Sequence, residues 1–517
     1  MPIYLANRRA ASTIFHVTNS DVLALSPLVD RLRPILAAES QPVYLVGGTV
    51  RDALLGRPIH DIDLVVANGA IPLTFRVANI LNLPAYVLDQ ERDVGRIVAP
   101  GKDLTLDIAR FRGPTLEDDL RGRDFTINAM ALPIESQAAR DIIDRHNGLG
   151  DLAAGQIRRI HEDSLTDDPV RAIRAARFAA QLGFELTAET AAAARAAAAL
   201  LPSRISPERL RDELSKLLAG GAPHIGVALL QDLGILEYVL PEVAALDGLA
   251  QSPPHHEDVF RHTLSVLRFG AAIDALIMDE GDTSTEAWST AVESLLAPYR
   301  RPMQDHLAIL LDGGIQTRLL LMWGGLFHDI GKAVTRTIAP DGRIRFLGHD
   351  GKGATMAEER LSSLSFSNEV RQRGRHIVEG HMRPLLLAND RHVPSRRTIY
   401  RYFRALGPAG LDVALLAIAD HFATYEGHLD QESWEPLRVV LETLIDTYFN
   451  GYEQTIAPAR LLNGQAIMDE LGIAPGNEIG RLLRLLEEAQ ASGDVITRDE
   501  ALSFIHRHHR ERRSPDS

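Results

Sequence analysis

The chain contains no cysteine among its 517 residues, which excludes a disulfide framework and any zinc site built on thiolates. No run of about eighteen apolar residues occurs, and residues 1–20 lack the apolar centre of a signal peptide, so we expect a cytoplasmic protein without membrane spans. An excess of basic residues is also absent, because the formal net charge is −14. Any contact with a nucleic acid must therefore use local basic patches.

The length and the hydrophobic patterning predict several domains. At 517 residues the chain exceeds one compact core, and its size alone indicates roughly three to four domains. From about residue 25 to 160, short apolar runs alternate with helical stretches, which indicates a mixed β-sheet with helices. Helical spacing dominates afterwards, as in the alanine-rich stretch 187–201. We therefore predict a multidomain α+β protein whose later domains are all-α.

Residues 45–66, LVGGTVRDALLGRPIHDIDLVV, carry the most informative pattern. Gly47 and Gly48 follow an apolar strand and open a helix, and without Cβ atoms they let backbone N–H groups approach a phosphate. Asp61 and Asp63 lie two apart in the next strand, so both carboxylates point to the same side. Such a pair can hold the divalent ions that nucleotidyl transfer requires. Taken singly, each feature is more often an ordinary turn or a solvated strand end.

The order of these features resembles the signature shared by tRNA CCA-adding enzymes and bacterial poly(A) polymerases. Asp107, in the strand-like run LTLDIARF, stands where that family places a third acidic residue. The run RDFTINAM, which begins at Arg123, resembles the family's RRDFTxNA motif. Gly122 replaces the first arginine of that motif, a departure that reduces the expected contact with the triphosphate.

Residues 167–178, DDPVRAIRAARF, resemble the family's EDxxRxxRAxRF helix. Asp168 and Arg171 are three apart, so we expect both on one helix face. The resemblance implies that this pair selects CTP or ATP through hydrogen bonds to the Watson–Crick edge of the base. Arg174 and Arg177 continue a basic face toward phosphate or RNA. The alternative is a surface ion pair beside a solvated arginine stripe, which is commoner in an arbitrary helix.

The resemblance thus implies a complete nucleotidyltransferase site. Asp61 and Asp63, supported by Asp107, would hold two Mg²⁺ ions that activate the RNA 3′-hydroxyl and stabilise the leaving pyrophosphate. Further residues would bind the nucleotide: Gly47, Gly48, Arg51 and Arg123 at the triphosphate, Asp52 near the ribose, Asn128 at the ribose or its loop, and Asp168, Arg171, Arg174 and Arg177 as described above.

A second constellation occupies the middle of the chain. It contains an upstream histidine, an adjacent His-Asp pair in GLFHDIGK, two further histidines and a downstream aspartate. This order resembles the metal-binding HD phosphohydrolase superfamily. The implied ligands of a divalent transition metal or Mg²⁺ are His262, His328, Asp329, His349, His381 and Asp420. Such a site can activate water for phosphoester hydrolysis, although some domains of this type keep their ligands without activity.

The resemblance implies a template-independent enzyme that adds CCA to tRNA from CTP and ATP. The segment between Asp107 and Arg123 is shorter than in many members, so addition of CC alone is an alternative. A poly(A) polymerase is a second alternative. A third is an HD phosphohydrolase whose nucleotidyltransferase half is degenerate and serves only to bind RNA.

These assignments divide the chain into five parts. We predict an N-terminal arm over 1–24, a nucleotidyltransferase domain over 25–160, a helical nucleobase- and RNA-binding domain over 161–245, an HD domain over 246–425 and a helical tRNA-binding region over 426–517. Three basic segments are candidates for tRNA contact, namely residues 204–216, 391–404 and 506–513.

Overall fold

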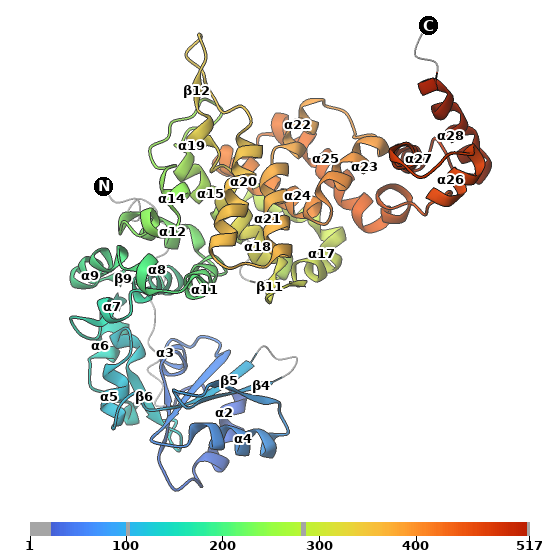
Figure 1. Ribbon diagram of the computed structural model, residues 1–517. Coiled ribbons are helices and arrows are strands. Elements are labelled where there is room, and N and C mark those ends of the chain that lie inside the picture. Colours follow the sequence, from blue (N-terminus) through green and yellow to red (C-terminus); the bar gives the residue numbers. More distant parts are fainter. Residues whose placement is uncertain (1–21, 100–103, 281–285, 514–517) are drawn as a thin grey trace. The chain divides into compact units, whose positions relative to one another are not determined.

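The computed structural model describes residues 22–99, 104–280 and 286–513, so most of the predicted N-terminal arm lies outside the described residues. The chain divides into two compact units. The first comprises Met1–Leu217 and Ile225–Val239, and the second comprises Leu218–His224 and Leu240–Ser517. A mixed sheet with helices precedes largely helical parts, which confirms the predicted fold class (Figure 1). The finer domain boundaries stay predictions.

The first unit is built on a seven-stranded sheet in the order β3-β4-β5-β2-β1-β6-β7. Its strands are β1 (Val43–Val46), β2 (Asp61–Val66), β3 (Ala85–Asp89), β4 (Val94–Ala99), β5 (Leu104–Arg110), β6 (Met130–Pro133) and β7 (Ile143–Asp144). Every neighbouring pair is antiparallel except β2 and β5, which run parallel. The alternating burial of β2, with Ile62, Leu64 and Val66 fully inside, sends the odd-numbered side chains of its first half to the opposite face.

Short helices link and cover this sheet. They are α2 (Pro27–Leu36), α3 (Gly48–Leu54), α4 (Ala70–Leu81), α5 (Leu116–Arg121), the 3₁₀ helices η2 (Thr126–Asn128) and η3 (Ala139–Asp141), and α6 (Gly148–Ala153). Ser26 caps α2 ahead of a proline, and Thr115 forms a capping box with Asp118 at α5. These caps satisfy the backbone N–H groups that a helix start leaves free.

The rest of the first unit is helical apart from the small pair β8 (Gln156–Ile157) and β9 (Glu185–Leu186). Its helices are α7 (Ser164–Asp167), α8 (Val170–Leu182), α9 (Ala188–Ala198), α10 (Leu201–Arg204), α11 (Pro207–Leu218), α12 (Pro223–Asp232) and α13 (Leu236–Val239). Helix α8 buries its alanines together with Ile173 and Phe178. This helix therefore has a closely packed apolar face and a face that carries arginines.

Helices also dominate the second unit. Its first part contains α14 (Pro241–Ala244), α15 (Val259–Met278), α16 (Ala287–Leu296), η4 (Ala297–Tyr299), α17 (Arg300–Leu307), α18 (Thr317–Phe327), α19 (Lys332–Thr335), α20 (His349–Ser363), α21 (Asn368–Gly380), α22 (Arg383–Asn389), α23 (Arg396–Leu406), α24 (Ala409–Thr424) and α25 (Gln431–Asn450). Two small hairpins interrupt them, β10 (Leu310–Leu311) with β11 (Ile315–Gln316) and β12 (Thr337–Ile338) with β13 (Ile344–Arg345). Helix α24 is buried along nearly its whole length.

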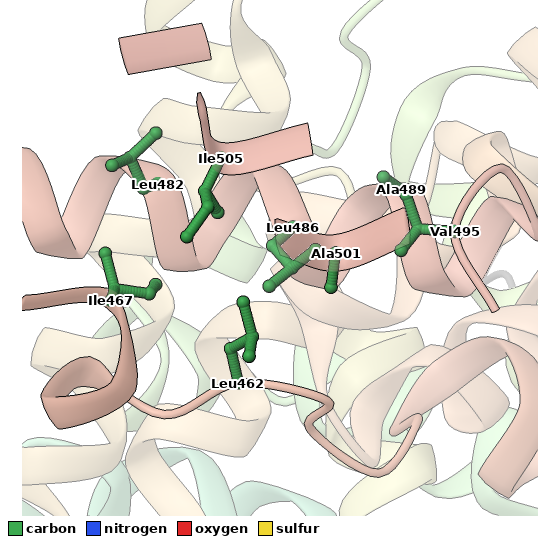
Figure 2. Packing of buried hydrophobic residues seen from close by; sticks show 8 residues of the cluster. All are labelled: Leu462, Ile467, Leu482, Leu486, Ala489, Val495, Ala501 and Ile505. Atoms are coloured by element: carbon green, nitrogen blue, oxygen red, sulfur yellow. The ribbon is translucent and has the colours of Figure 1, made fainter. Parts of the chain in front are cut away.

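The chain ends in a small helical bundle that follows the π-helical turn η5 (Tyr452–Ile456). The bundle consists of α26 (Gly464–Leu471), α27 (Asn477–Ser492) and α28 (Arg498–Arg513). Figure 2 shows its core, to which α27 contributes Leu482, Leu486 and Ala489. The core residues are Leu462, Ile467, Leu482, Leu486, Ala489, Val495, Ala501 and Ile505.

No single helix among the described residues is long and apolar enough to cross a membrane. Helices α23 and α24 reach the length and apolar composition of a membrane span only when they are taken together, and they meet at an angle of 102°.

Removal of a central side chain should destabilise the terminal bundle. Leu482 is fully buried in its core, so Leu482→Ala should lower the free energy of unfolding by about 2–5 kcal/mol through lost burial and a residual cavity. Ile496→Ala is the matched control because Ile496 is 70% exposed, and it should change that free energy by less than about 0.5 kcal/mol. Denaturant unfolding measures both. Equal effects would contradict the assigned core.

Candidate functional site

The pairing of β2 with β5 brings the first group of predicted residues together. In this parallel register Asp63 lies opposite Asp107, and Asp61 lies opposite Thr105. The Asp61 carboxylate is exposed and accepts a hydrogen bond of 2.5 Å from the Thr105 hydroxyl. The three carboxylates thus share one face of the sheet, as the alternation of strand residues requires.

Electrostatics give this face the character of a cation site. Burial raises the pKa of Asp63, the neighbouring Asp107 and Asp61 raise it further, and Arg123 opposes them. Asp107 accepts two hydrogen bonds of 2.7 Å from Arg96. A partly buried carboxyl beside two like charges is stabilised by a nearby cation, and carboxylate oxygens are the ligands that hard divalent ions prefer. The donor set therefore fits a divalent metal.

Gly47 joins this carboxylate face to the start of α3. Its φ of +67° favours glycine, and a Cβ there would lie 2.7 Å from Nη1 of Arg123 and 3.4 Å from Oδ2 of Asp63. The Arg123 side chain donates to Asp119 from Nε at 3.1 Å and from Nη2 at 2.9 Å. Sequence reasoning missed Asp119, which is buried one turn before Arg123. Arg123 is consequently held beside the carboxylates and the N-terminus of α3.

A chain of hydrogen bonds links the Gly-Gly helix to α8. Arg51 binds both oxygens of Asp52 and donates from Nη1 to Asn128 at 2.7 Å. Asn128 in turn donates to Asp124 at 3.0 Å, and Arg174 donates to the other oxygen of Asp124 at 2.8 Å. Burial alone would raise the pKa of Asp124, but Arg174 and the hydrogen bonds from Asn128 and Phe125 hold it well below its usual range.

The remaining arginines of α8 bind internal carboxylates. Arg177 donates to Glu213 at 3.0 Å, and Arg174 also approaches Glu213 at 3.4 Å. Arg177 is buried, with 9% of the residue exposed. Contact with phosphate or RNA would require these ion pairs to open. We therefore expect Arg174 and Arg177 to fix α8 against Glu213 of α11.

Asp168 and Arg171 are close together but do not share a helix, so that expectation is wrong. Asp168 is extended, with φ −137° and ψ 89°, and α8 begins only at Val170. Proline at the next position disfavours the helical conformation for Asp168. The two side chains nevertheless approach to 4.0 Å, because Asp168 immediately precedes the first turn of α8.

Both predicted base-reading side chains have protein partners. Arg209 of α11 donates to the two oxygens of Asp168 at 3.0 and 2.8 Å. Arg171 donates to the carbonyl oxygens of Gly122 and Arg123 at 2.8 and 2.9 Å. A base that binds Asp168 must therefore compete with Arg209, a residue that the sequence indicated only as a possible tRNA contact.

The six predicted residues of the second constellation all converge in the second unit. They form two groups, His262 with His328 and Asp420, and Asp329 with His349 and His381, and within each group the potential ligand atoms lie within 4.8 Å of one another. The groups come from separate elements: α15, the end of α18, the start of α20, the end of α21, and α24.

Backbone carbonyls orient three of these imidazoles. Nδ1 of His328 lies 2.8 Å from the carbonyl oxygen of Gly325. In the same way, Nδ1 of His349 and of His381 lie 2.8 and 2.7 Å from the carbonyl oxygens of Phe346 and Val378. A carbonyl can only accept, so each Nδ1 carries the proton and each Nε2 offers a lone pair. Nε2 of His328 is buried without a well-aligned hydrogen bond among the described residues. This arrangement fits a divalent metal.

A cavity of about 1090 Å³ opens onto four of the six residues, namely Asp329, His349, His381 and Asp420. Lys332 lines it and lies 2.6 Å from Asp329, and three arginines of the lining add positive charge. These are Arg343, Arg345 and Arg391. His255, also in the lining, stacks edge-on against His262 at 4.7 Å between ring centroids. The lining also contains Asp430 and Glu432, and Glu432 accepts a hydrogen bond from Arg391 at 3.1 Å. The cavity therefore combines carboxylate–imidazole groups with basic side chains that can contact a phosphoester.

Arginines of the basic segment 391–404, a predicted candidate for tRNA contact, form ion pairs within the second unit. Arg397 and Arg401 of α23 bind Glu488 of α27, and Arg397 also binds Asp494 at 2.7 Å. Arg404 approaches Glu487 at 3.4 Å. These arginines attach the terminal bundle to the preceding helices of the same unit.

Comparisons with known proteins agree with this geometry. Residues 43–158 match the Poly A polymerase head domain, residues 183–246 match the probable RNA and SrmB-binding site of polymerase A, and residues 294–425 match the HD domain. An A-adding tRNA nucleotidyltransferase of Deinococcus radiodurans is 35% identical over 92% of this chain and 98% of its own length. The chain belongs to the tRNA nucleotidyltransferase and poly(A) polymerase family.

Other members match over similar lengths. A CC-adding tRNA nucleotidyltransferase of Thermus thermophilus is 33% identical over 89% of this chain and 92% of its own. A solved structure of a CCA-adding enzyme with CTP has a TM-score of 0.57 at 20% identity and covers 94% of this chain and 96% of its own. That likeness shows the fold alone. Three of the predicted site residues lie outside the matched ranges. Asp168 and Arg171 fall between the head-domain and RNA-binding matches, and His262 precedes the HD-domain match.

Stability should fall as the solution is acidified. Burial lowers the pKa of four histidines of the second unit to about 4, namely His224, His255, His381 and His421. Unfolded histidine has a pKa of about 6.5, so between pH 6.5 and 4 the unfolded state binds more protons and gains stability as pH falls.

Metal-free protein should accordingly show a lower unfolding temperature at pH 5 than at pH 7. Calorimetry in buffers of different ionisation enthalpy should find an uptake of about one proton per such histidine at pH 5. An unfolding temperature and proton uptake that stay constant over this range would contradict the burial of neutral histidines.

Proposed function

We propose that the protein adds nucleotides of the CCA end to the 3′ terminus of tRNA, using CTP and ATP without a nucleic-acid template. The observation that carries this proposal is the register that sets Asp63 beside Asp107, with Arg123 held against Gly47 at the start of a helix. The names of the relatives support tRNA as the acceptor, because they include both A-adding and CC-adding tRNA nucleotidyltransferases.

The carboxylate face prepares the chemistry. Asp61, Asp63 and Asp107 would hold Mg²⁺, which when bound acidifies the attacking 3′-hydroxyl and neutralises charge on the leaving pyrophosphate. Arg96 holds the Asp107 carboxylate in a fixed orientation through its two hydrogen bonds. The attacking and leaving oxygens would then meet an arrangement that needs little reorganisation.

Binding of the triphosphate would fall to the turn and its arginine. The absence of a Cβ at Gly47 leaves the backbone N–H groups at the start of α3 open to the phosphates, where the helix dipole also favours negative charge. Arg123 would bind the same phosphates, and its bond to Asp119 fixes its position. Arg51, which the sequence placed at the triphosphate, is buried and bound to Asp52 and Asn128, so it would instead orient the loop around the ribose.

Base selection would use Asp168 and Arg171. A carboxylate accepts from the exocyclic amine that cytosine and adenine share, and a guanidinium donates to ring nitrogen or carbonyl. The amine would replace one of the two hydrogen bonds that Arg209 makes with Asp168. Incorporation of CTP and ATP measured separately distinguishes complete CCA addition from CC or A addition, and long ATP tails on unrelated RNA would identify a poly(A) polymerase.

Loss of the Asp63 carboxylate should abolish this activity. Asp63→Asn keeps the side-chain shape but removes a partly buried charge from the carboxylate face, so incorporation into tRNA should fall by on the order of a hundredfold or more. Asp89→Asn, at the end of β3 in the same sheet, is the matched control and should retain activity. Incorporation of labelled nucleotide into tRNA that lacks CCA measures both. Full activity of Asp63→Asn would remove the proposed mechanism.

A second function is favoured by the two ligand groups and by the basic side chains of the cavity beside them. We propose that the HD site binds a divalent transition metal or Mg²⁺ and hydrolyses phosphoesters. His328 belongs to one group and its sequence neighbour Asp329 to the other, so the two groups are adjacent. Lys332 forms an ion pair with Asp329 at 2.6 Å, which orients that carboxylate. The buried, carbonyl-oriented imidazoles would keep their metal-binding nitrogens toward the cavity.

His328→Ala should separate the two activities. The variant should lose bound metal and any hydrolysis of phosphoesters, because one Nε2 ligand is gone, and should keep incorporation into tRNA. His376→Ala, on α21 outside both groups, is the control and should bind metal as the parent protein does. Metal content by mass spectrometry gives a direct readout. Unchanged metal content in His328→Ala would contradict the assigned ligands.

A further inference from the structure

Position 122 lacks the arginine that the related motif carries, and the structure shows what occupies its surroundings. Gly122 has φ −72° and ψ −4°, a conformation open to any residue, so its backbone does not require glycine. A Cβ there would lie 3.2 Å from Cδ of Arg112. The side chain of Arg112, which follows β5, therefore fills the space beside Gly122.

Arg112 is anchored to the same loop that holds the proposed triphosphate ligand. Its Nη1 donates to the Gly122 carbonyl at 2.8 Å, and its backbone N–H donates to Asp119 at 3.2 Å. Asp119 also holds Arg123. Arg171 donates to the Gly122 carbonyl as well, at 2.8 Å, so two guanidinium groups meet at one oxygen atom.

Positive charge is therefore in excess at this point. Three guanidinium groups surround the peptide Gly122–Arg123: those of Arg112 and Arg123 share the Asp119 carboxylate, and that of Arg171 lies 4.0 Å from Asp168, which Arg209 also binds. Clustered, partly desolvated cations are stabilised by an anion, and guanidinium groups bind phosphate oxygens through paired N–H donors.

Arg112 can reach a ligand. Its side chain is 52% exposed, in contrast to the 10% exposure of Arg123. Asp119 joins Arg112 to Arg123, because it accepts hydrogen bonds from both residues, and Arg123 lies beside Gly47 and Asp63. Asp63, Gly47 and Arg123 form the place where the proposed mechanism puts the phosphates.

We propose that Arg112 binds the phosphates of the incoming nucleoside triphosphate and replaces the arginine that position 122 lacks. This inference rests on the proposed nucleotidyltransferase function. It adds a substrate-binding residue supplied from the end of β5, outside the RDFTIN segment.

The test compares binding of tri- and monophosphates without tRNA. Arg112→Ala should weaken equilibrium binding of CTP and ATP by about tenfold to a hundredfold, because a charge-assisted hydrogen bond is lost. Binding of CMP and AMP should stay unchanged, since the lost contact lies beyond the first phosphate. Arg110→Ala is the matched control: Arg110 is an exposed arginine that ends β5, on the strand face opposite Asp107, and its removal should affect neither class of nucleotide.

A relocated arginine gives a second readout. Gly122→Arg added to Arg112→Ala should restore much of the triphosphate affinity, because the conformation at position 122 accepts a side chain and Cδ of Arg112 no longer blocks it. Arg112→Lys should show intermediate affinity, since it keeps the charge but loses the paired donors.

The outcomes are distinct. Equal weakening of mono- and triphosphate binding would overturn the proposal and make Arg112 a brace for the loop, and unchanged triphosphate binding would overturn it outright. Failure of the parent protein to bind or incorporate CTP and ATP would instead remove the proposed function on which this inference depends.

Discussion

The register between β2 and β5 is the constraint on which the nucleotidyltransferase site depends. It sets Asp63 opposite Asp107 and leaves Asp61 at the open end of the strand. A slip of one residue would turn these carboxylates into the core and expose Ile62 and Leu64, which are now buried. The hydrophobic alternation of β2 therefore fixes both the sheet and the position of the reactive face.

Alternating acidic and basic side chains connect this face to the helices that would read the base. Asp124 and Glu213 bind the arginines of α8. Asn128 donates to Asp124 and accepts from Arg51 of α3, so it links the two helices. Because an unpaired buried charge is costly, each member depends on its neighbour. Binding of a nucleotide would thus change the hydrogen bonds of Asp168 and Arg171, while the ion pairs of Asp124 and Glu213 keep α8 in place.

The sequence predicted the parts of the fold and site that rest on local order. Strand alternation located Asp61 and Asp63, and the succession of histidines and aspartates located six residues that converge in space. The sequence did not predict contacts between distant segments, such as the ion pair of Arg209 with Asp168 or that of Arg397 with Asp494 of the terminal bundle. Spacing also misplaced Asp168 on a helix, because the following proline holds it extended.

The most direct test of the account is incorporation of labelled CTP and ATP, each alone and both together, into tRNA that ends before C, before the second C or before A. The account predicts incorporation of at least one of the two nucleotides, confined to tRNA and stopping within the CCA end. No incorporation into any of these acceptors in the presence of Mg²⁺, by protein that binds the nucleotides, would contradict it.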